Sequence, residues 1–454
     1  MANTTTALPK LKLPLQAMPA TAGESPWPFR LVLLSLIFEF GRPQEIIPGI
    51  KSIPFPTIIN AIIALSILSS GKFSLKNPQT KLWFPLLGLM IIHIPIAINN
   101  FWAAMTFKDM LLVFCLYLGL ITYVNTFERV RTLILVWLNL HVVTALMGIA
   151  SGGSGVGGWM GDENDFCMAI NMVIPFAFFM MYTQPTLATR GKYILLLGLY
   201  VFTVMVTLSR GGFMGMSAAG AYCWLKSPMK IGSVFLIILL MIFMVSVAPD
   251  TYWDEVKSSF SEEEMDTGTG GDRLYIWGIG FEMFLSNPIL GVGQGNFPWT
   301  FEVYEAGRTH MDRSRAGRAA HSLYFTLMPE MGLVGVSIFL AMLYFNRQDI
   351  KTIERIVRMN AGPGLKGIVD NENRSALLMA RAMEGSMIGF LVSSIFISTL
   401  WYPSFWVMMG FIIALRNVMV DRLTQLGASF DPGTNRSIGR VVSISGSEKR
   451  FRPV

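Results

Sequence analysis

Long apolar stretches recur along almost the whole chain, and one polar stretch, residues 249–320, interrupts them. Many of the apolar stretches approach the ~20 residues that an α-helix needs to cross the ~30 Å hydrocarbon core of a membrane. They are continuously apolar instead of alternating with polar residues, which excludes a closed β-barrel. The pattern therefore predicts an all-α polytopic protein that crosses a membrane many times.

The composition supports this prediction. Hydrophobic residues make up 52% and charged residues 14% of the 454 residues, so a soluble protein of this size would expose large apolar patches. We expect about twelve transmembrane helices, most of them near the length needed to cross the hydrocarbon core. They cover residues 29–48, 53–70, 81–99, 108–124, 130–149, 164–183, 192–208, 211–225, 231–248, 321–345, 376–399 and 402–418.

Lysine and arginine residues distinguish the two sides of this bundle. Connections rich in them alternate along the chain with connections that contain few. Because basic residues gather on the cytoplasmic side of membrane proteins, both chain ends are expected in the cytoplasm and residues 249–320 outside it. The net charge of +7 is explained in this way, without binding to nucleic acid.

This topology divides the chain into five parts. They are a disordered cytoplasmic leader at 1–28, transmembrane helices at 29–248, a large extracytoplasmic loop at 249–320, further transmembrane helices at 321–418 and a basic cytoplasmic tail at 419–454. The large loop is expected to contain short helices, one of them near residues 272–286.

Three ionisable residues far apart in the sequence fall on the predicted outer side. Arg210 lies in TLSRGGFMG, Arg273 in GTGGDRLYIW, and His321 ends the polar loop. Arginine donates paired hydrogen bonds to phosphate oxygens, and a histidine that titrates near neutrality can take a proton from an attacking hydroxyl. An enzyme on this side has no ATP and needs an already activated substrate, such as a diphosphate-linked lipid.

Arg42 is a third candidate for contact with phosphate, although a local pair with Glu39, three residues earlier, explains it as well. Glu330 lies nine residues after His321, on roughly the opposite face of a helix. We therefore expect Glu330 to pack against a helix or to orient a loop.

Further charged residues on the outer side have two possible roles. The acids of GDENDF either cap a helix N-terminus or bind hydroxyl groups of an acceptor; they are Asp162, Glu163 and Asp165. The arginines that precede His321 either contact a substrate, an acceptor or an anionic lipid surface, or order the loop; they are Arg308, Arg313, Arg315 and Arg318. No metal and no cofactor is expected, because the four histidines are scattered and no carboxylate–histidine spacing is typical of a zinc or calcium site.

Several of these motifs together resemble the O-antigen ligase and O-antigen polymerase superfamily. The segment HSLYFTLMPEMGLVG, residues 321–335, resembles its signature of a histidine followed by apolar residues, a glutamate and spaced glycines. NPILGVGQGNF, SRGGFMG and GDRLYIW resemble the turn before that signature, the arginine-bearing helix end and the loop arginine. The segment GDENDF is similar to a segment of ligase-like proteins associated with exosortase systems.

The resemblance implies a membrane glycosyltransferase of the C type, in the bacterial inner membrane, with its active site facing the periplasm. Ligases of this superfamily move a glycan from undecaprenyl diphosphate to a hydroxyl of a lipid A core sugar in lipopolysaccharide biosynthesis. By position, His321 matches the general base, and Arg210 and Arg273 match the diphosphate-binding arginines. The implied reaction is independent of metal and inverts the anomeric carbon.

Two alternatives remain open. A polymerase of O-antigen or exopolysaccharide would use the same donor and the same residues but a second lipid-linked glycan as acceptor. A transporter of lipid-linked glycans would also need a basic cavity, but transporters usually have ionisable residues near the middle of the membrane and internal repeats. Here Arg381 and Glu384 lie near one helix end, where they can pair, and no repeat is evident.

Overall fold

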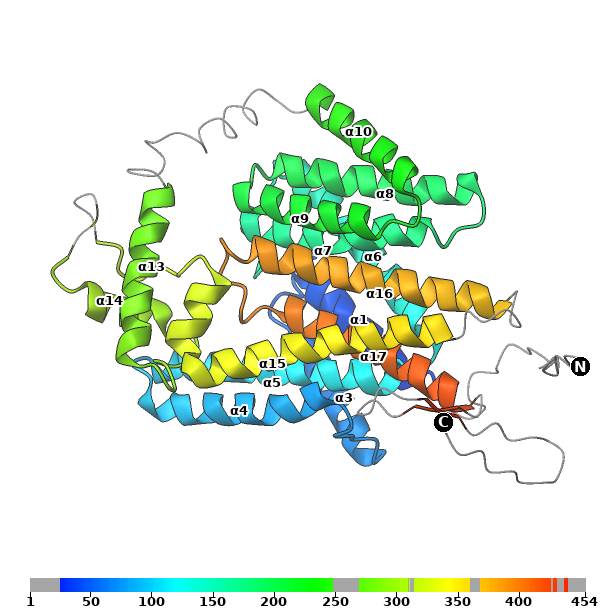
Figure 1. Ribbon diagram of the computed structural model, residues 1–454. Helices are drawn as coiled ribbons and strands as arrows, with labels where there is room; N and C mark the ends of the chain where they lie inside the picture. Colours follow the sequence, from blue (N-terminus) through cyan, green and yellow to red (C-terminus); the bar gives the residue numbers. More distant parts are fainter. Residues whose placement is uncertain are drawn as a thin grey trace, which may run out of the picture.

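The chain is almost entirely helical in the computed structural model, which describes residues 25–247, 269–308, 310, 314–359, 368–425, 428–430 and 437–439. Long helices lie side by side and form the body of the molecule (Figure 1). Before the polar loop they are α1 (Trp27–Leu36), the π-helix η1 (Ile37–Gly41), α2 (Pro43–Ile46), α3 (Phe55–Ser69), α4 (Pro78–Ile96), α5 (Asn100–Tyr123), α6 (Phe127–Ala150), α7 (Glu163–Met181), α8 (Leu187–Val206), α9 (Arg210–Lys226) and α10 (Lys230–Val247). After residue 268 they are α13 (Thr269–Ser286), α14 (Phe297–Glu305), α15 (Leu323–Met359), α16 (Ile368–Ser393) and α17 (Pro403–Gln425), followed by the antiparallel strands β1 (Ala428–Phe430) and β2 (Ser437–Gly439).

Eight helices in the described part of the chain are long and apolar enough to cross a membrane, as expected for a polytopic membrane protein. They are α4, α5, α6, α7, α8, α15, α16 and α17. Helices also occupy the other four positions where the sequence predicts a span. Of these, α3, α9 and α10 fall short of the required length or apolarity within their described residues, and the first is divided into α1, η1 and α2.

Helix α7 lies at the centre of the bundle. It is buried from residue 166 to residue 181 and packs against α8, α9 and α16. The contact of α9 with α16 is close, because a Cβ atom at Gly215 would lie 1.9 Å from Ser393 Oγ. Asn171 joins the three helices, since its side-chain amide donates to Gly212 O at 2.7 Å and to Ser393 Oγ at 3.0 Å. This contact fixes where α9 begins.

Helix α15 extends further than the span predicted at 321–345, because it continues to Met359. The extension is amphipathic, and its isoleucines at positions 350, 353 and 356 are buried. Their spacing of three places them on one helix face. An apolar stretch alone did not predict this part, since charged residues begin at Arg347.

The same helix has a sharp kink near its start. At Gly332 φ is 59° and ψ is −167°, a conformation that side chains rarely allow. A Cβ atom there would also lie 2.4 Å from Ile289 O in the turn before α14. The kink therefore lets the first two turns of α15 pack tightly against that turn.

Helix α16 ends at Ser393, before the predicted end at residue 399. The chain then turns through residues 394–402, named here the 394–402 loop, before Pro403 begins α17. Thr399 Oγ1 donates to Ser394 Oγ at 2.7 Å inside this loop. The backbone carbonyl of Ser394 accepts from Leu323 N of α15, so it is not paired within α16, and the helix ends here.

Two further expectations need correction or lie partly outside the described residues. Arg381 and Glu384 do not form the expected pair: Glu384 contacts Arg347 and Tyr222, while Arg381 Nη1 donates to Lys226 O at 3.0 Å. Helices α1 and α17 extend slightly into the predicted leader and tail. The leader at 1–24, the loop at 248–268 and the tail at 440–454 lie outside the described residues.

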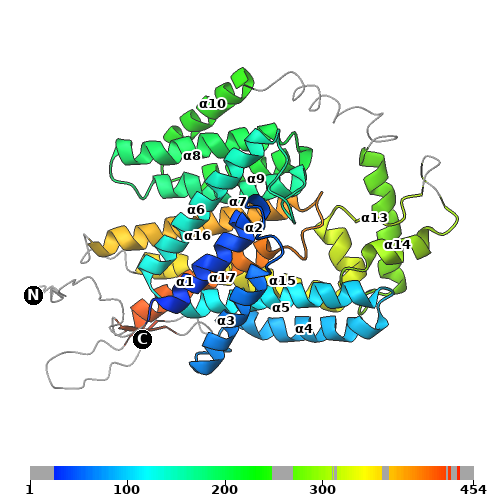
Figure 2. The same cartoon turned by 180° about the vertical axis from the view of Figure 1, so that it is seen from behind.

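The expected short helices of the polar loop are α13 and α14, and the predicted helix near 272–286 is confirmed. Both lie at the end of the bundle where α15 begins, and α13 packs against α15 and α14. Figure 2 shows the same arrangement from behind, with α13 and α14 apart from the ends of α3 and α17.

Candidate functional site

His321 lies between the polar loop and α15, in a backbone conformation that few residues adopt. Its φ is 46°, in the left-handed region. Hydrogen bonds hold the chain on both sides of it: Trp277 Nε1 donates to Ala320 O at 2.8 Å, and Leu323 N donates to Ser394 O at 2.9 Å. Helix α13 and the 394–402 loop therefore fix the position of His321.

The imidazole is accessible to water, yet enough protein surrounds it to affect its protonation. Partial burial lowers the pKa of His321 below its usual 6.5, and the positive charges of Arg273 and Arg318 lower it further. The negative charge of Asp162 opposes this shift. The net effect favours the neutral imidazole at pH 7, and this is the form that can accept a proton.

Arg273 lies on α13, one helical turn before Trp277, next to the 394–402 loop. Its guanidinium carbon lies over the ring of Phe396, 5.6 Å from the centroid. Trp277 stacks on Phe325 of α15 with ring centroids 4.8 Å apart. These aromatic and cation–π contacts hold α13 against α15 and the 394–402 loop, the two segments next to His321.

Arg210 is the first residue of α9. Ser209 caps this helix by accepting a hydrogen bond from a backbone N–H, and its hydroxyl donates to Asn164 Oδ1 of α7 at 2.8 Å. A Cβ atom at Gly211 would lie 3.1 Å from Phe396 Cβ. The helix that begins with Arg210 therefore contacts, at Gly211, the same phenylalanine whose ring Arg273 covers.

The three acids of GDENDF lie at the N-terminus of α7, as one of the two interpretations of this motif predicts. Asp162 is the cap, and its Oδ1 accepts from Asn164 N at 2.8 Å. Glu163 is exposed in the first turn. Asp165 Oδ2 accepts from Tyr402 Oη of the 394–402 loop at 2.9 Å. The acids thus link α7 to the loop that carries Phe396.

Arg42 is buried and held by a local ion pair, but its partner differs from the predicted one. Arg42 Nη2 lies 3.5 Å from Glu45 Oε1. Glu39, the partner suggested by the sequence, instead accepts a hydrogen bond from Trp159 Nε1 at 3.1 Å. The ring of Trp159 lies 5.3 Å from that of Tyr402. This chain of contacts therefore links Glu39, and not Arg42, to the 394–402 loop.

Arg308 and Arg318 of the loop are both exposed, but their neighbours differ. Arg308 donates two hydrogen bonds to the carboxylate of Glu282, at 3.1 and 2.9 Å, and both side chains are exposed. The hydrogen bonds from Arg308 lower the pKa of Glu282, and the charge of Arg308 lowers it further. Arg318 is exposed near His321. Arg313 lies outside the described residues.

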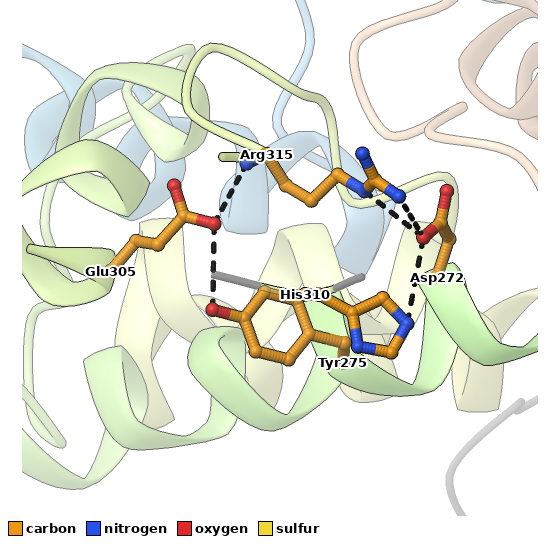
Figure 3. Close-up of polar contacts among 5 residues, drawn as sticks. All are labelled: Asp272, Tyr275, Glu305, His310 and Arg315. Carbon is orange, nitrogen blue, oxygen red and sulfur yellow. Dashed lines mark hydrogen bonds and ion pairs between the residues drawn. The ribbon is translucent and has the colours of Figure 1, made fainter. Parts of the chain in front are cut away.

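Arg315 is buried and connects the loop to α13 and α14 (Figure 3). Its Nε and Nη2 donate to Asp272 Oδ1 at 3.0 and 2.7 Å, and its backbone N donates to Glu305 Oε1 at 2.7 Å. His310 stacks on Tyr275 with centroids 4.8 Å apart, and its Nε2 lies 3.6 Å from Asp272 Oδ1. Because Asp272 directly precedes the site arginine of α13, Arg315 orders the segment that carries it.

Glu330 orients a loop, as the sequence suggests, and its partners come from two segments. The carboxylate accepts hydrogen bonds from Gly295 N and Phe297 N, both at 2.9 Å, and from Trp401 Nε1 at 2.8 Å. The side chain is only 2% exposed. It therefore fixes the turn before α14 and the 394–402 loop to α15.

Replacing Glu330 with glutamine should destabilise the protein by about 1–3 kcal/mol, because the new amide N–H₂ faces a backbone donor that the carboxylate satisfied. Thermal unfolding in detergent measures this loss. Glu302→Gln, at an exposed position of α14, is the matched control and should leave the midpoint unchanged. Equal midpoints for both variants would contradict a holding role for Glu330.

The turn before α14, residues 287–296 and named here the glycine-rich turn, is also held by the first half of the chain. The motifs did not reveal this. His93 of α4 contacts this turn through both ring nitrogens. Its Nδ1 is 2.9 Å from Gln294 Oε1, and its Nε2 is 3.0 Å from Leu290 O. Asn99 N, before α5, donates to Asn296 Oδ1 at 2.7 Å. The sequence signal was a histidine inside an apolar stretch, which indicates a buried polar contact but not its partner.

Comparison with known proteins adds independent support. No curated protein matches the chain. Residues 194–340 match the family model described as O-antigen ligase. The matched segment contains Arg210, Arg273, His321 and Glu330. This match covers about a third of the chain and supports the O-antigen ligase superfamily that the motifs resemble.

Proposed function

We propose that the protein is an O-antigen ligase that transfers a glycan from undecaprenyl diphosphate to a hydroxyl group of a lipid A core sugar. The family match and the membrane helices support an enzyme of ligase or polymerase type. The finer proposal depends mainly on one observation: the charge of Arg273 acts on His321, and the helix that begins with Arg210 contacts, at Gly211, the Phe396 whose ring Arg273 covers.

In this proposal His321 is the general base, and Arg210 and Arg273 bind the diphosphate. Arg42 is a third candidate, and it would reach the diphosphate only if its pair with Glu45 opened. The exposed Asp162 and Glu163, together with Arg318, are candidates for contact with the acceptor. Asp165 and Arg315 have partly buried protein partners, which favours a role in ordering the site, whereas Arg308 is exposed and paired with the exposed Glu282.

The proposed reaction is a single displacement. The neutral imidazole of His321 takes the proton of the acceptor hydroxyl while its oxygen attacks the anomeric carbon of the glycan. A new carbon–oxygen bond forms as the bond to the diphosphate oxygen breaks, so the configuration at this carbon inverts. The leaving undecaprenyl diphosphate keeps the bonding electrons, and the two guanidinium groups compensate its charge. This leaving group needs neither a general acid nor a metal ion.

We also propose twelve spans in the bacterial inner membrane, with both chain ends in the cytoplasm and residues 249–320 in the periplasm. The alternation of basic and nearly uncharged connections supports this topology. A cysteine introduced at exposed Ala316 should react with an impermeant maleimide added to spheroplasts, whereas one at exposed Lys351 should react only after lysis. The reverse pattern would overturn the topology.

Reconstitution with defined acceptors tests the function. Purified protein in liposomes would receive an undecaprenyl-diphosphate glycan together with either lipid A core or a second lipid-linked glycan, in buffer containing a chelator. A ligase forms a glycan on lipid A core, and a polymerase forms a longer lipid-linked glycan. Absence of both products would overturn the proposal.

The pH dependence of transfer should shift in opposite directions in two variants. Asp162→Asn removes a charge that raises the pKa of His321, and Arg318→Gln removes one that lowers it. Transfer needs the neutral imidazole, so the rate falls as pH drops through this pKa. The acid limb should therefore move to lower pH in Asp162→Asn and to higher pH in Arg318→Gln. Initial rates between about pH 5 and 8 measure the position of the acid limb in each variant. An acid limb that stays at the wild-type pH in both variants would argue against His321 as the titrating base.

A further inference from the structure

A second polar site lies at the opposite end of the bundle from α13 and α14, where α3 and α5 end and α1 and α6 begin (Figures 1 and 2). A cavity of about 200 Å³ opens there. The described residues that line it are Ser25, Pro28, Ser66, Ser70, Lys72, Tyr123 and Arg129. Two of these side chains are basic, four carry a hydroxyl group, and none is acidic.

The Arg129 guanidinium is held in place at this cavity. Its Nη1 donates to Tyr123 O and to Asn125 Oδ1, both at 2.9 Å. Its guanidinium carbon lies over the ring of Phe29, 5.2 Å from the centroid. A planar guanidinium fixed by such contacts loses little conformational freedom when it binds an oxyanion.

Lys72 and a pair of hydroxyl groups complete the wall. Lys72 Nζ lies 5.8 Å from the centroid of the Tyr123 ring. The hydroxyl oxygens of Ser66 and Tyr123 are 2.7 Å apart, so one of their two hydrogens forms the bond between them. The other hydrogen can be donated to a ligand. The cavity thus offers positive charge and hydroxyl donors together.

This chemistry suits a phosphate group, which has several acceptor oxygens and negative charge. Glu128, the acid next to Arg129, is exposed and does not line the cavity. Lys72 and Arg129 belong to the basic connections expected on the cytoplasmic side, and anionic phospholipids are abundant in that leaflet. We propose that the cavity binds the phosphate of an anionic phospholipid headgroup. This proposal does not depend on the activity proposed above.

Native mass spectrometry of the purified full chain in detergent tests this site. The wild type would be titrated separately with phosphatidylglycerol, with phosphatidylcholine and with inorganic phosphate. Lys72→Gln combined with Arg129→Gln removes both cavity charges and should weaken phosphatidylglycerol binding about 30-fold. Lys76→Gln combined with Arg131→Gln removes two exposed charges from the same connections outside the cavity and should leave binding unchanged.

Equal losses in the two double variants would show general attraction to surface charge and would overturn the site. Equal binding of phosphatidylcholine would do the same. If inorganic phosphate binds with the same dependence on Lys72 and Arg129 and phosphatidylglycerol does not, the ligand is free phosphate and the lipid assignment is wrong. Because Arg129 also holds the ends of α5 and α6, Lys72→Glu alone serves as a second variant: its side chain is exposed, and it should lose phosphatidylglycerol binding without unfolding.

Discussion

Replacing Arg273 or Arg210 with alanine should lower glycan transfer about 100- to 1,000-fold, because a charged donor at the site of developing negative charge typically contributes about 2.7–4 kcal/mol to the transition state. The loss should appear mainly in kcat, since the charge on the diphosphate grows as its bond to the sugar breaks. The measurement is the initial rate of glycan transfer by purified variants in liposomes.

The matched control is Arg308→Ala. Arg308 lies in the same loop region as Arg273, but it is exposed and paired with Glu282. Its removal should leave the rate close to that of the wild type. Membrane insertion and the thermal midpoint should be the same for all three variants. Wild-type turnover in the Arg210 or Arg273 variant would contradict the proposed diphosphate clamp.

Replacing His321 with asparagine should lower kcat by about 10²- to 10⁴-fold, the usual contribution of a general base. Asparagine suits this test because it tolerates the left-handed backbone that His321 adopts, with φ at 46°. Asparagine therefore removes the base without adding backbone strain, whereas alanine would remove the base and also strain the backbone. The measurement is kcat and KM for the lipid-linked donor.

Donor binding separates the roles of His321 and the arginines. His321→Asn should bind the undecaprenyl-diphosphate glycan as tightly as the wild type, because the imidazole is assigned to the acceptor hydroxyl and not to the diphosphate. Unchanged kcat in this variant would exclude His321 as the base. Lost donor binding with unchanged stability would instead place the histidine at the diphosphate.

The helices were largely predictable from the sequence because a membrane demands long apolar stretches, and these are visible without tertiary information. The end of α15 was not, since its buried isoleucines alternate with charged residues. The end of α16 at Ser393 depends on the contact of Leu323 N with Ser394 O. Contacts of this kind come from another part of the chain and leave no periodic signal.

The candidate site shows the same limit. Arg210, Arg273 and His321 were recognisable because charged residues are scarce among apolar stretches and occur here in a motif order. Phe396 and Trp401 were missed, because an aromatic residue in an apolar stretch is the commonest kind of packing residue. A role for Arg315 in ordering the loop was one of two open interpretations, but its partner Asp272, 43 residues away, depends on the folded loop.

The hydrogen bonds from α4 and α5 to the glycine-rich turn set a condition for chimeric proteins. Gln294 and Asn296 lie inside the family-matched segment, whereas His93 and Asn99 lie far upstream of it. A hybrid that combined residues 194–340 with the N-terminal helices of an unrelated protein would carry every motif of the resemblance except GDENDF and would still lack the residues that hold that turn. A hybrid that keeps the structure of this turn would therefore also need His93 and Asn99.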